Sequence, residues 1–136
     1  MARQAVCDAV ERHLSDSWSR AAIFGENVEG LTPEDGTPFV VIQYPFVTSR
    51  QISMGAPGSN VWRDDGAFRV VIHVERGSGT KMGREWADEI AALFRGKDLG
   101  VIQTWAPTAP VTNDRNAEAT YYVLSFSVPY SHDYFG

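Results

Sequence analysis

Apolar residues recur at helical spacing near the start of the chain. Val6, Val10, Leu14 and Trp18 stand four positions apart, and charged residues fill most of the opposite side. This spacing places one apolar stripe along an amphipathic helix. We expect a helix over residues 2–19 that buries this stripe against a core.

Three later segments have the pattern of strands. Residues 67–75 and 120–130 alternate between apolar and polar side chains, and residues 39–46 form a short β-branched and aromatic run. Alternation with a period of two indicates strands with one buried face. The side chains expected to face inward are Phe68, Val70, Ile72 and Val74 in the first segment and Tyr122, Leu124, Phe126 and Val128 in the last. A short strand is also expected at 101–105.

A second helix is expected over residues 80–95. Met82, Trp86 and Ile90 form its apolar stripe, followed by Leu93 or Phe94, and Gly96 follows at a position where glycine commonly ends a helix. The resulting order is α-β-(arm)-β-α-β-β. It predicts an α+β fold in one domain, residues 1–136, with a mixed, mainly antiparallel sheet of about four strands packed by two helices.

The segment 48–66 is expected to be a long loop or an extended hairpin arm. Gly55, Pro57 and Gly58 lie at its centre, and the next residues include an Arg-Asp-Asp-Gly sequence at 63–66 that favours a turn. A compact domain rarely keeps so long an irregular connection without a purpose. The arm carries the residues Ile52, Met54, Val61, Trp62 and Arg63, which we take as a candidate subunit interface. The alternative is that the arm folds back on its own domain.

Composition limits the classes of function. The chain has 136 residues, 43% of them hydrophobic, and a formal net charge of −5, which argues against a free-standing nucleic-acid-binding protein. Its one cysteine, Cys7, excludes an internal disulfide and is expected to be a packing residue. No apolar run is long enough to span a bilayer, and residues 1–12 lack the features of a signal peptide. We therefore expect no membrane contact and synthesis in the cytoplasm.

The residues that could carry chemistry have simpler interpretations. His13, His73 and His132 are not spaced as metal ligands, and no cysteine pair lies beside them. The sequence GSGT at 77–80 lacks the spacing of a phosphate-binding loop or of a nucleophile elbow, and it is expected to be a turn that caps the second helix. We expect no metal ion and no cofactor.

Two further groups of residues could carry chemistry but also have structural interpretations. Asp64 and Asp65 could act as an acid and base pair, but a turn before a strand is the simpler interpretation. The aromatic residues could stack on bases, but few cations lie near them, so core or interface positions are favoured. These aromatic residues are Trp62, Trp105, Tyr121 and Tyr122.

An ordered set of short motifs resembles the tail terminator proteins of long-tailed bacteriophages and of phage-like gene transfer agents. Between an amphipathic helix at 5–18 and a strand at 121–123, the set comprises PFVV at 38–41, QISMG at 51–55, RDDGAF at 63–68, GSGT at 77–80, WADEI at 86–90 and FRG at 94–96. The resemblance covers about residues 2–131, and the loop at 106–118 matches no motif.

The resemblance implies a structural subunit without catalytic residues. Such a subunit would form a hexameric ring on the last ring of the tail tube, stop tube polymerisation, and present a surface to a head-completion or stopper protein. DNA would pass through the ring without specific binding, and an acidic lumen would repel its phosphates. Two alternatives stay open: another neck protein, such as the stopper, or a small enzyme or ligand-binding domain that uses His73, Glu75 and Asp64 in a cleft.

Overall fold

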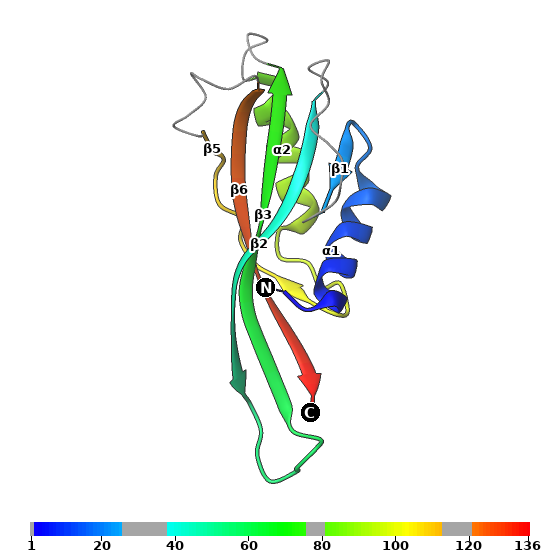
Figure 1. Ribbon diagram of the computed structural model, residues 1–136, viewed down its shortest axis with the longest axis vertical. Helices are drawn as coiled ribbons and strands as arrows, with labels where there is room; N and C mark the ends of the chain where they lie inside the picture. The colour runs from blue at the N-terminus through cyan, green and yellow to red at the C-terminus, as the bar shows by residue number, and fades with distance from the viewer. Residues whose placement is uncertain (1, 26–37, 76–80, 113–120) are drawn as a thin grey trace.

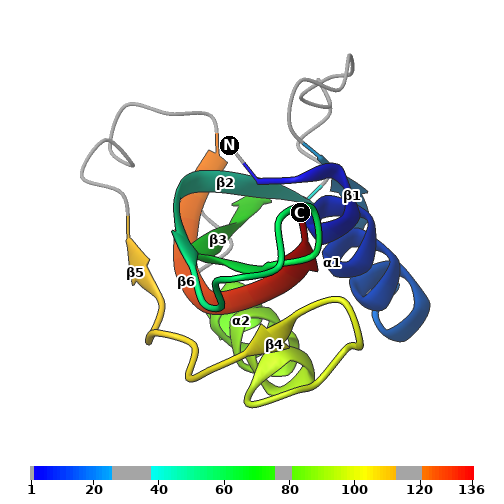
Figure 2. The ribbon, with the colours of Figure 1, turned by 90° about the horizontal axis from the view of Figure 1, so that it is seen from below.

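The computed structural model describes residues 2–25, 38–75, 81–112 and 121–136. They form two helices and one curled, six-stranded sheet (Figures 1 and 2). In chain order the elements are α1 (Gln4–Ser17), β1 (Ala22–Phe24), β2 (Phe39–Gln51), β3 (Val61–Glu75), α2 (Lys81–Phe94), β4 (Gln103–Thr104), β5 (Val111–Thr112) and β6 (Tyr121–Phe135).

The sheet is mixed and mainly antiparallel, as the sequence predicted. Its strands follow the order β1-β2-β3-β6-β4, and β5 pairs with β6 outside this path. Among the described strands, only β1 and β2 pair in parallel, with Ala22 opposite Phe39. The sheet has more strands than the expected four, because β1 and β5 are too short to show a periodic pattern.

Both helices pack on one face of the sheet and close the core. The stripe of α1 is buried as expected, although Trp18 lies just beyond the end of the helix. The indole rings of Trp18 and Trp86 meet edge to face with their centroids 5.3 Å apart, which joins α1 to α2. From the sheet, the inward residues Phe68, Val70 and their alternating neighbours fill the space beneath.

The predicted strands are longer in the structure than their apolar patterns. β2 continues to Gln51, β3 begins at Val61, and β6 continues to Phe135, so most of the segment 48–66 is paired strand. The turn predicted at 63–66 is wrong, because Arg63, Asp64 and Asp65 lie inside β3. Their side chains form ion pairs and hydrogen bonds with neighbouring groups, which makes a strand tolerable for aspartate.

A bulge marks the place where the sheet leaves the body of the domain. The register between β2 and β3 shifts between Gln43 and Phe46, around Pro45, which cannot donate to the ladder. Beyond the bulge, three strands continue as a narrow extension, which we call the arm. It consists of residues 46–51 of β2, the loop 52–60, residues 61–67 of β3 and residues 129–136 (Figure 1).

Candidate assembly surface on the arm

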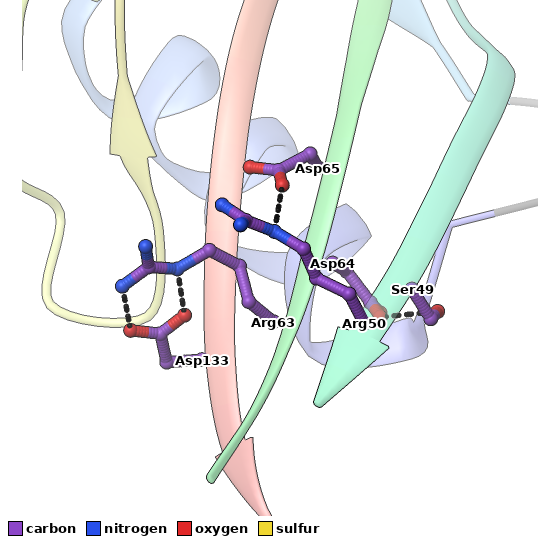
Figure 3. A network of polar contacts seen from close by, with 6 residues as sticks. All are labelled: Ser49, Arg50, Arg63, Asp64, Asp65 and Asp133. Carbon is purple, nitrogen blue, oxygen red and sulfur yellow. Dashed lines mark hydrogen bonds and ion pairs between the residues drawn. The ribbon is translucent and has the colours of Figure 1, made fainter. Parts of the chain in front are cut away.

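A buried carboxylate lies at the base of the arm. The side chain of Asp64 is only 2% exposed, yet both of its oxygens have partners. Arg3 Nε donates to Oδ2 at 2.6 Å, and Ser49 Oγ donates to Oδ1 at 2.6 Å (Figure 3 draws the second contact). Because buried charge is costly unless it is paired and hydrogen-bonded, these contacts make this strand position stable for aspartate.

Arg3 joins the start of α1 to two strands of the arm. Besides Asp64 in β3, its guanidinium reaches Tyr134 in β6, where Nη2 donates to the phenol oxygen at 2.5 Å. The guanidinium carbon also lies 4.2 Å from the centre of the Tyr134 ring. The hydrogen bond to Asp64 raises the pKa of Arg3, so the cation stays charged. The arm is therefore attached to the body by side-chain contacts as well as by its strands.

The opposite face of the arm carries two exposed ion pairs. Successive side chains of a strand point to opposite faces, so Arg63 and Asp65 face away from Asp64. Arg63 forms a bidentate pair with Asp133, at 2.7 and 2.8 Å, and Arg50 Nε lies 3.1 Å from Asp65 (Figure 3). The hydrogen bond from Arg63 lowers the pKa of Asp133. These pairs give the face a fixed pattern of charge.

Large apolar side chains are exposed at the tip of the arm. Met54 is 87% exposed, Phe135 is 77% exposed and Ile52 is 43% exposed. Phe135 lies opposite Val61 in the register of β3 and β6. Apolar side chains gathered at the end of a projecting element are typical of a surface that is covered by another protein.

The tip loop is ordered by its own hydrogen bonds. Ile52 N donates to the carbonyl oxygen of Val61 at 2.8 Å, and Val61 N donates to Ser53 Oγ at 2.8 Å. Asn60 and Gly136 exchange two backbone hydrogen bonds, at 3.0 and 2.9 Å. These bonds fix the backbone on both sides of the exposed Met54.

The predicted interface residues do not all lie on one surface. Ile52, Val61 and Arg63 lie on the face that carries the ion pairs, whereas Trp62 lies on the other face. The Trp62 indole Nε1 donates to the carbonyl oxygen of Gly136 at 3.1 Å, so this side chain contacts its own chain. On the arm, sequence reasoning missed two exposed apolar residues, Phe135 and Phe46, the second of which is 58% exposed. Phe135 lay beyond the predicted end of the last strand.

The histidines occupy structural positions. His13 Nε2 lies 2.8 Å from the carbonyl oxygen of Leu93, and His132 Nδ1 lies 2.8 Å from that of Val101. The ring of His73 stacks on that of Phe39 with centroids 4.2 Å apart, and burial lowers the pKa of His73. No cluster of three metal-ligating side chains is present among the described residues.

The cleft suggested for an enzyme does not form. Asp64 and His73 are nine positions apart in β3 and on opposite faces of the sheet, so they lie roughly 30 Å apart along the strand. Asp64 is also committed to Arg3 and Ser49. The candidate loop at 77–80 lies outside the described residues. In the described part of the chain, no helix has the length and apolar character to cross a membrane.

Other residues singled out from the sequence also have packing roles. Cys7 is partly buried on α1 and packs against the core. Tyr122 packs against the same core, while the side chain of Trp105 is about half exposed. The side chain of Tyr121 is outside the described part. An open groove of about 440 Å³ lies between α1 and residues 99–101, lined by Asp8, Arg12 and Asp16 among others.

The chain matches known proteins in family and in fold. A family model described as phage tail terminator protein matches residues 5–130. A solved protein structure is similar over 100% of this chain and 99% of its own, with a TM-score of 0.60 and 19% sequence identity. At this identity the likeness shows the fold alone. No curated protein sequence matches the chain.

Proposed function

This chain belongs to the phage tail terminator protein family, and from that premise we propose that it ends tail-tube growth as a hexameric ring. The resemblance found in the sequence is confirmed by the family match, which gives the chain a structural role in a phage tail. The proposed ring sits on the last ring of the tube, blocks further addition, and joins the tail to the head. We propose the same role if the particle is a gene transfer agent.

The observation that carries the proposal is the arm with its exposed apolar tip. A subunit whose chemistry is only assembly needs an extended contact surface, and Met54, Phe135 and Ile52 supply apolar area there. A ring also needs head-to-tail contacts, in which one surface of each copy meets a different surface of the next. An arm that reaches beyond the body suits such a contact because it presents two unlike edges.

The proposed partners follow from this position in the particle. Copies of the same chain form the ring, the tail tube protein lies on one side, and a head-completion or stopper protein lies on the other. DNA passes through the lumen without specific binding, and the net charge of −5 supports a lumen that repels phosphate groups. A ring structure with a strongly basic lumen would overturn this last point.

Deletion of the gene is the direct test of the proposed function. The subunit would assemble in the bacterial cytoplasm and remain in the neck of the particle. We expect electron microscopy of particles lacking the protein to show tails of uncontrolled length that are not joined to heads. Tails of normal length that fail to attach would instead indicate a different neck protein, and fully normal particles would overturn any role in the tail. Localisation in wild-type particles by antibody labelling distinguishes terminator from stopper.

A further inference from the structure

The arm has two open strand edges. β1 pairs with β2 only at residues 39–41, so residues 46–51 of β2 have no strand on their outer side in the described part of the chain. On the far side of the arm, β4 pairs with residues 130–131 of β6, and residues 133–135 have no strand beyond them there. Open edges offer unpaired N–H and C=O groups to another strand.

The hydrogen bonds between β2 and β3 determine which backbone N–H and C=O groups of β2 point away from β3. Ile52 N donates to Val61 on β3, and in an antiparallel pair every second residue faces the same partner. Counting back from Ile52 along the unbroken register, the backbone groups of Val47, Ser49 and Gln51 point away from β3. These three residues form the donor and acceptor row of the open edge.

The same reasoning applies to β6. Gly136 and Asn60 exchange both backbone hydrogen bonds and continue the register of β6 and β3. The backbone N–H and C=O groups of even-numbered residues in β6 therefore point towards β3. Pro129 agrees with this alternation. Its carbonyl oxygen points away from β3 and accepts a hydrogen bond from Trp105 N at 3.0 Å. The backbone groups of Asp133 and Phe135 therefore point outward.

The side chains at the two edges are complementary. One row across the arm reads Arg50, Arg63, Asp133, with a cation at the β2 edge and an anion at the β6 edge. The next row towards the tip has Ile52 at the β2 edge and Phe135 at the β6 edge. If two arms lay side by side with these rows aligned, Arg50 would meet a carboxylate and Ile52 would meet an aromatic ring.

We propose that these edges pair between neighbouring copies, residues 47–51 of β2 in one copy with residues 133–135 of β6 in the next. The inference rests on the proposed ring and names its subunit contact. β2 and β6 are both antiparallel to β3, so they run in the same direction. When all arms point alike, the two edges meet as parallel strands, and a closed ring leaves neither edge open.

Parallel pairing agrees with the hydrogen-bond phase in that aligned register. In a parallel pair, consider a residue whose N–H and C=O groups point towards the neighbouring strand. It bonds there to the two residues on either side of the residue directly opposite. Gln51 then lies opposite Tyr134 of the neighbouring copy. Its N–H donates to the carbonyl oxygen of the neighbouring Asp133, and its carbonyl oxygen accepts from the N–H of the neighbouring Phe135. Charge, apolar contact and backbone phase thus agree on a single register.

Proline substitutions test each edge separately. The N–H groups of Gln51 and Phe135 point outward, so Gln51→Pro and Phe135→Pro remove an edge donor without removing a bond to β3. We expect each variant alone to form no rings. A mixture in equal amounts should form a 1:1 dimer, because the intact β6 edge of the first meets the intact β2 edge of the second. Gln51→Ala and Phe135→Leu are the matched controls, which should still form rings.

Ring assembly on purified tail tubes and in solution is followed by electron microscopy and light scattering, and circular dichroism checks the fold of each variant. If wild-type protein forms rings and both proline variants form them equally well, the edge pairing is wrong and the proposed function stands. If wild-type protein forms no rings even on tubes, the proposed function fails, and the edge pairing fails with it.

A cross-link identifies the register even if a proline variant misfolds. Ile52→Cys and Phe135→Cys are combined in a Cys7→Ser background. Within one arm the two positions are separated by β3, about 10 Å, which is too far for a disulfide. Oxidation of assembled rings should therefore give a ladder of covalent multimers, and each single-cysteine variant should give none. Assembled rings of the double variant that stay uncross-linked would overturn the register.

Discussion

Arg3 and Asp64 lie 61 positions apart in the chain, but Arg3 Nε and Asp64 Oδ2 are 2.6 Å apart in the fold. The contact brings the residue before α1 under the base of the arm. It also compensates the charge of a carboxylate that is nearly inaccessible to solvent. The base of the arm is therefore held to the body by a side chain that lies 61 positions from Asp64 in the sequence.

Arg3→Ala should destabilise the protein. The substitution leaves the buried Asp64 with only Ser49 as a described partner, and we expect a loss of about 1–3 kcal/mol, at the low end because Arg3 is itself half exposed. Urea unfolding monitored by circular dichroism measures the change. Arg20→Ala removes an exposed pair with Glu89 and should change stability by less than about 0.5 kcal/mol. Equal effects of the two substitutions would contradict a special role for Arg3.

Tyr130→Phe should stabilise the protein slightly. The hydroxyl of Tyr130 is buried without a hydrogen-bond partner, so its removal should add about 1 kcal/mol. Burial raises the pKa of Tyr130 to about 12, above the unfolded value near 10. Above pH 10 the phenol ionises in the unfolded chain first, which favours unfolding. The stability present below pH 10 is therefore lost progressively as the pH rises towards 12. Unfolding curves across this range should show a smaller alkaline loss for the variant, and identical slopes would be contrary to this prediction.

His73 should make the fold sensitive to mild acid. Burial lowers its pKa below the unfolded value near 6.5, so the neutral ring is favoured in the folded state. The contribution is complete above pH 6.5 and is lost as the pH falls through the folded pKa. Thermal unfolding between pH 7 and pH 5 should show a falling midpoint, with a shallower fall in His73→Gln. An unchanged slope would assign the acid sensitivity to other groups.

Gly66→Ala should destabilise the base of the arm. A Cβ atom at Gly66 would lie 2.6 Å from the carbonyl oxygen of Phe46 and 3.0 Å from the hydroxyl of Tyr130. The backbone oxygen cannot move without disturbing the pairing of β2 and β3, so we expect a loss of about 1–3 kcal/mol in chemical denaturation. Arg69→Ala, at an exposed position of the same strand, serves as the control. A loss no larger than the control's would mean that the strands can separate locally.

Met54→Ser should weaken assembly without affecting the folded subunit. The side chain is 87% exposed, so the stability of the monomer should change by less than about 0.5 kcal/mol. Rings or capped tubes should nevertheless form less readily, because an apolar contact is lost on association. Sedimentation and electron microscopy with tail tubes measure this. Unaltered assembly would place the interface away from the tip.

The body of the fold was predictable because its periodic patterns are long. The stripe from Val6 to Trp18 and the alternation from Phe68 to Val74 reflect burial on one side, and both were confirmed. For the arm, the sequence leaves a long loop and an extended hairpin both open, because the arm has little core to bury; the paired strands agree with the hairpin. Its inward positions include Asp64 and His132, which are stabilised by hydrogen bonds instead of apolar packing. Such polar contacts leave no periodic pattern of hydrophobic residues in the sequence, so they cannot be predicted from it.

The candidate surface was predictable in part. Ile52 and Met54 stood out as apolar residues in an exposed segment, and the structure shows both exposed. The sequence places Trp62 beside Val61 and Arg63, and only the geometry of a formed strand separates these neighbours onto opposite faces. The predicted strand ends at residue 130 because the next residues, Ser131, His132 and Asp133, interrupt the apolar alternation. Phe135 therefore lies outside the strand that the sequence predicts.

The arm extends from one end of the body only, and the helices lie towards the other end (Figure 1). A ring built from such subunits, all oriented alike, has two faces that differ in shape. One face is fringed by the tips that carry Met54, and the other presents the bodies. Seated on the end of a tube, such a ring turns one face to the tube and a differently shaped face to the next component. The two neighbours of the ring would then contact different parts of the same subunit, one the tips of the arms and the other the bodies.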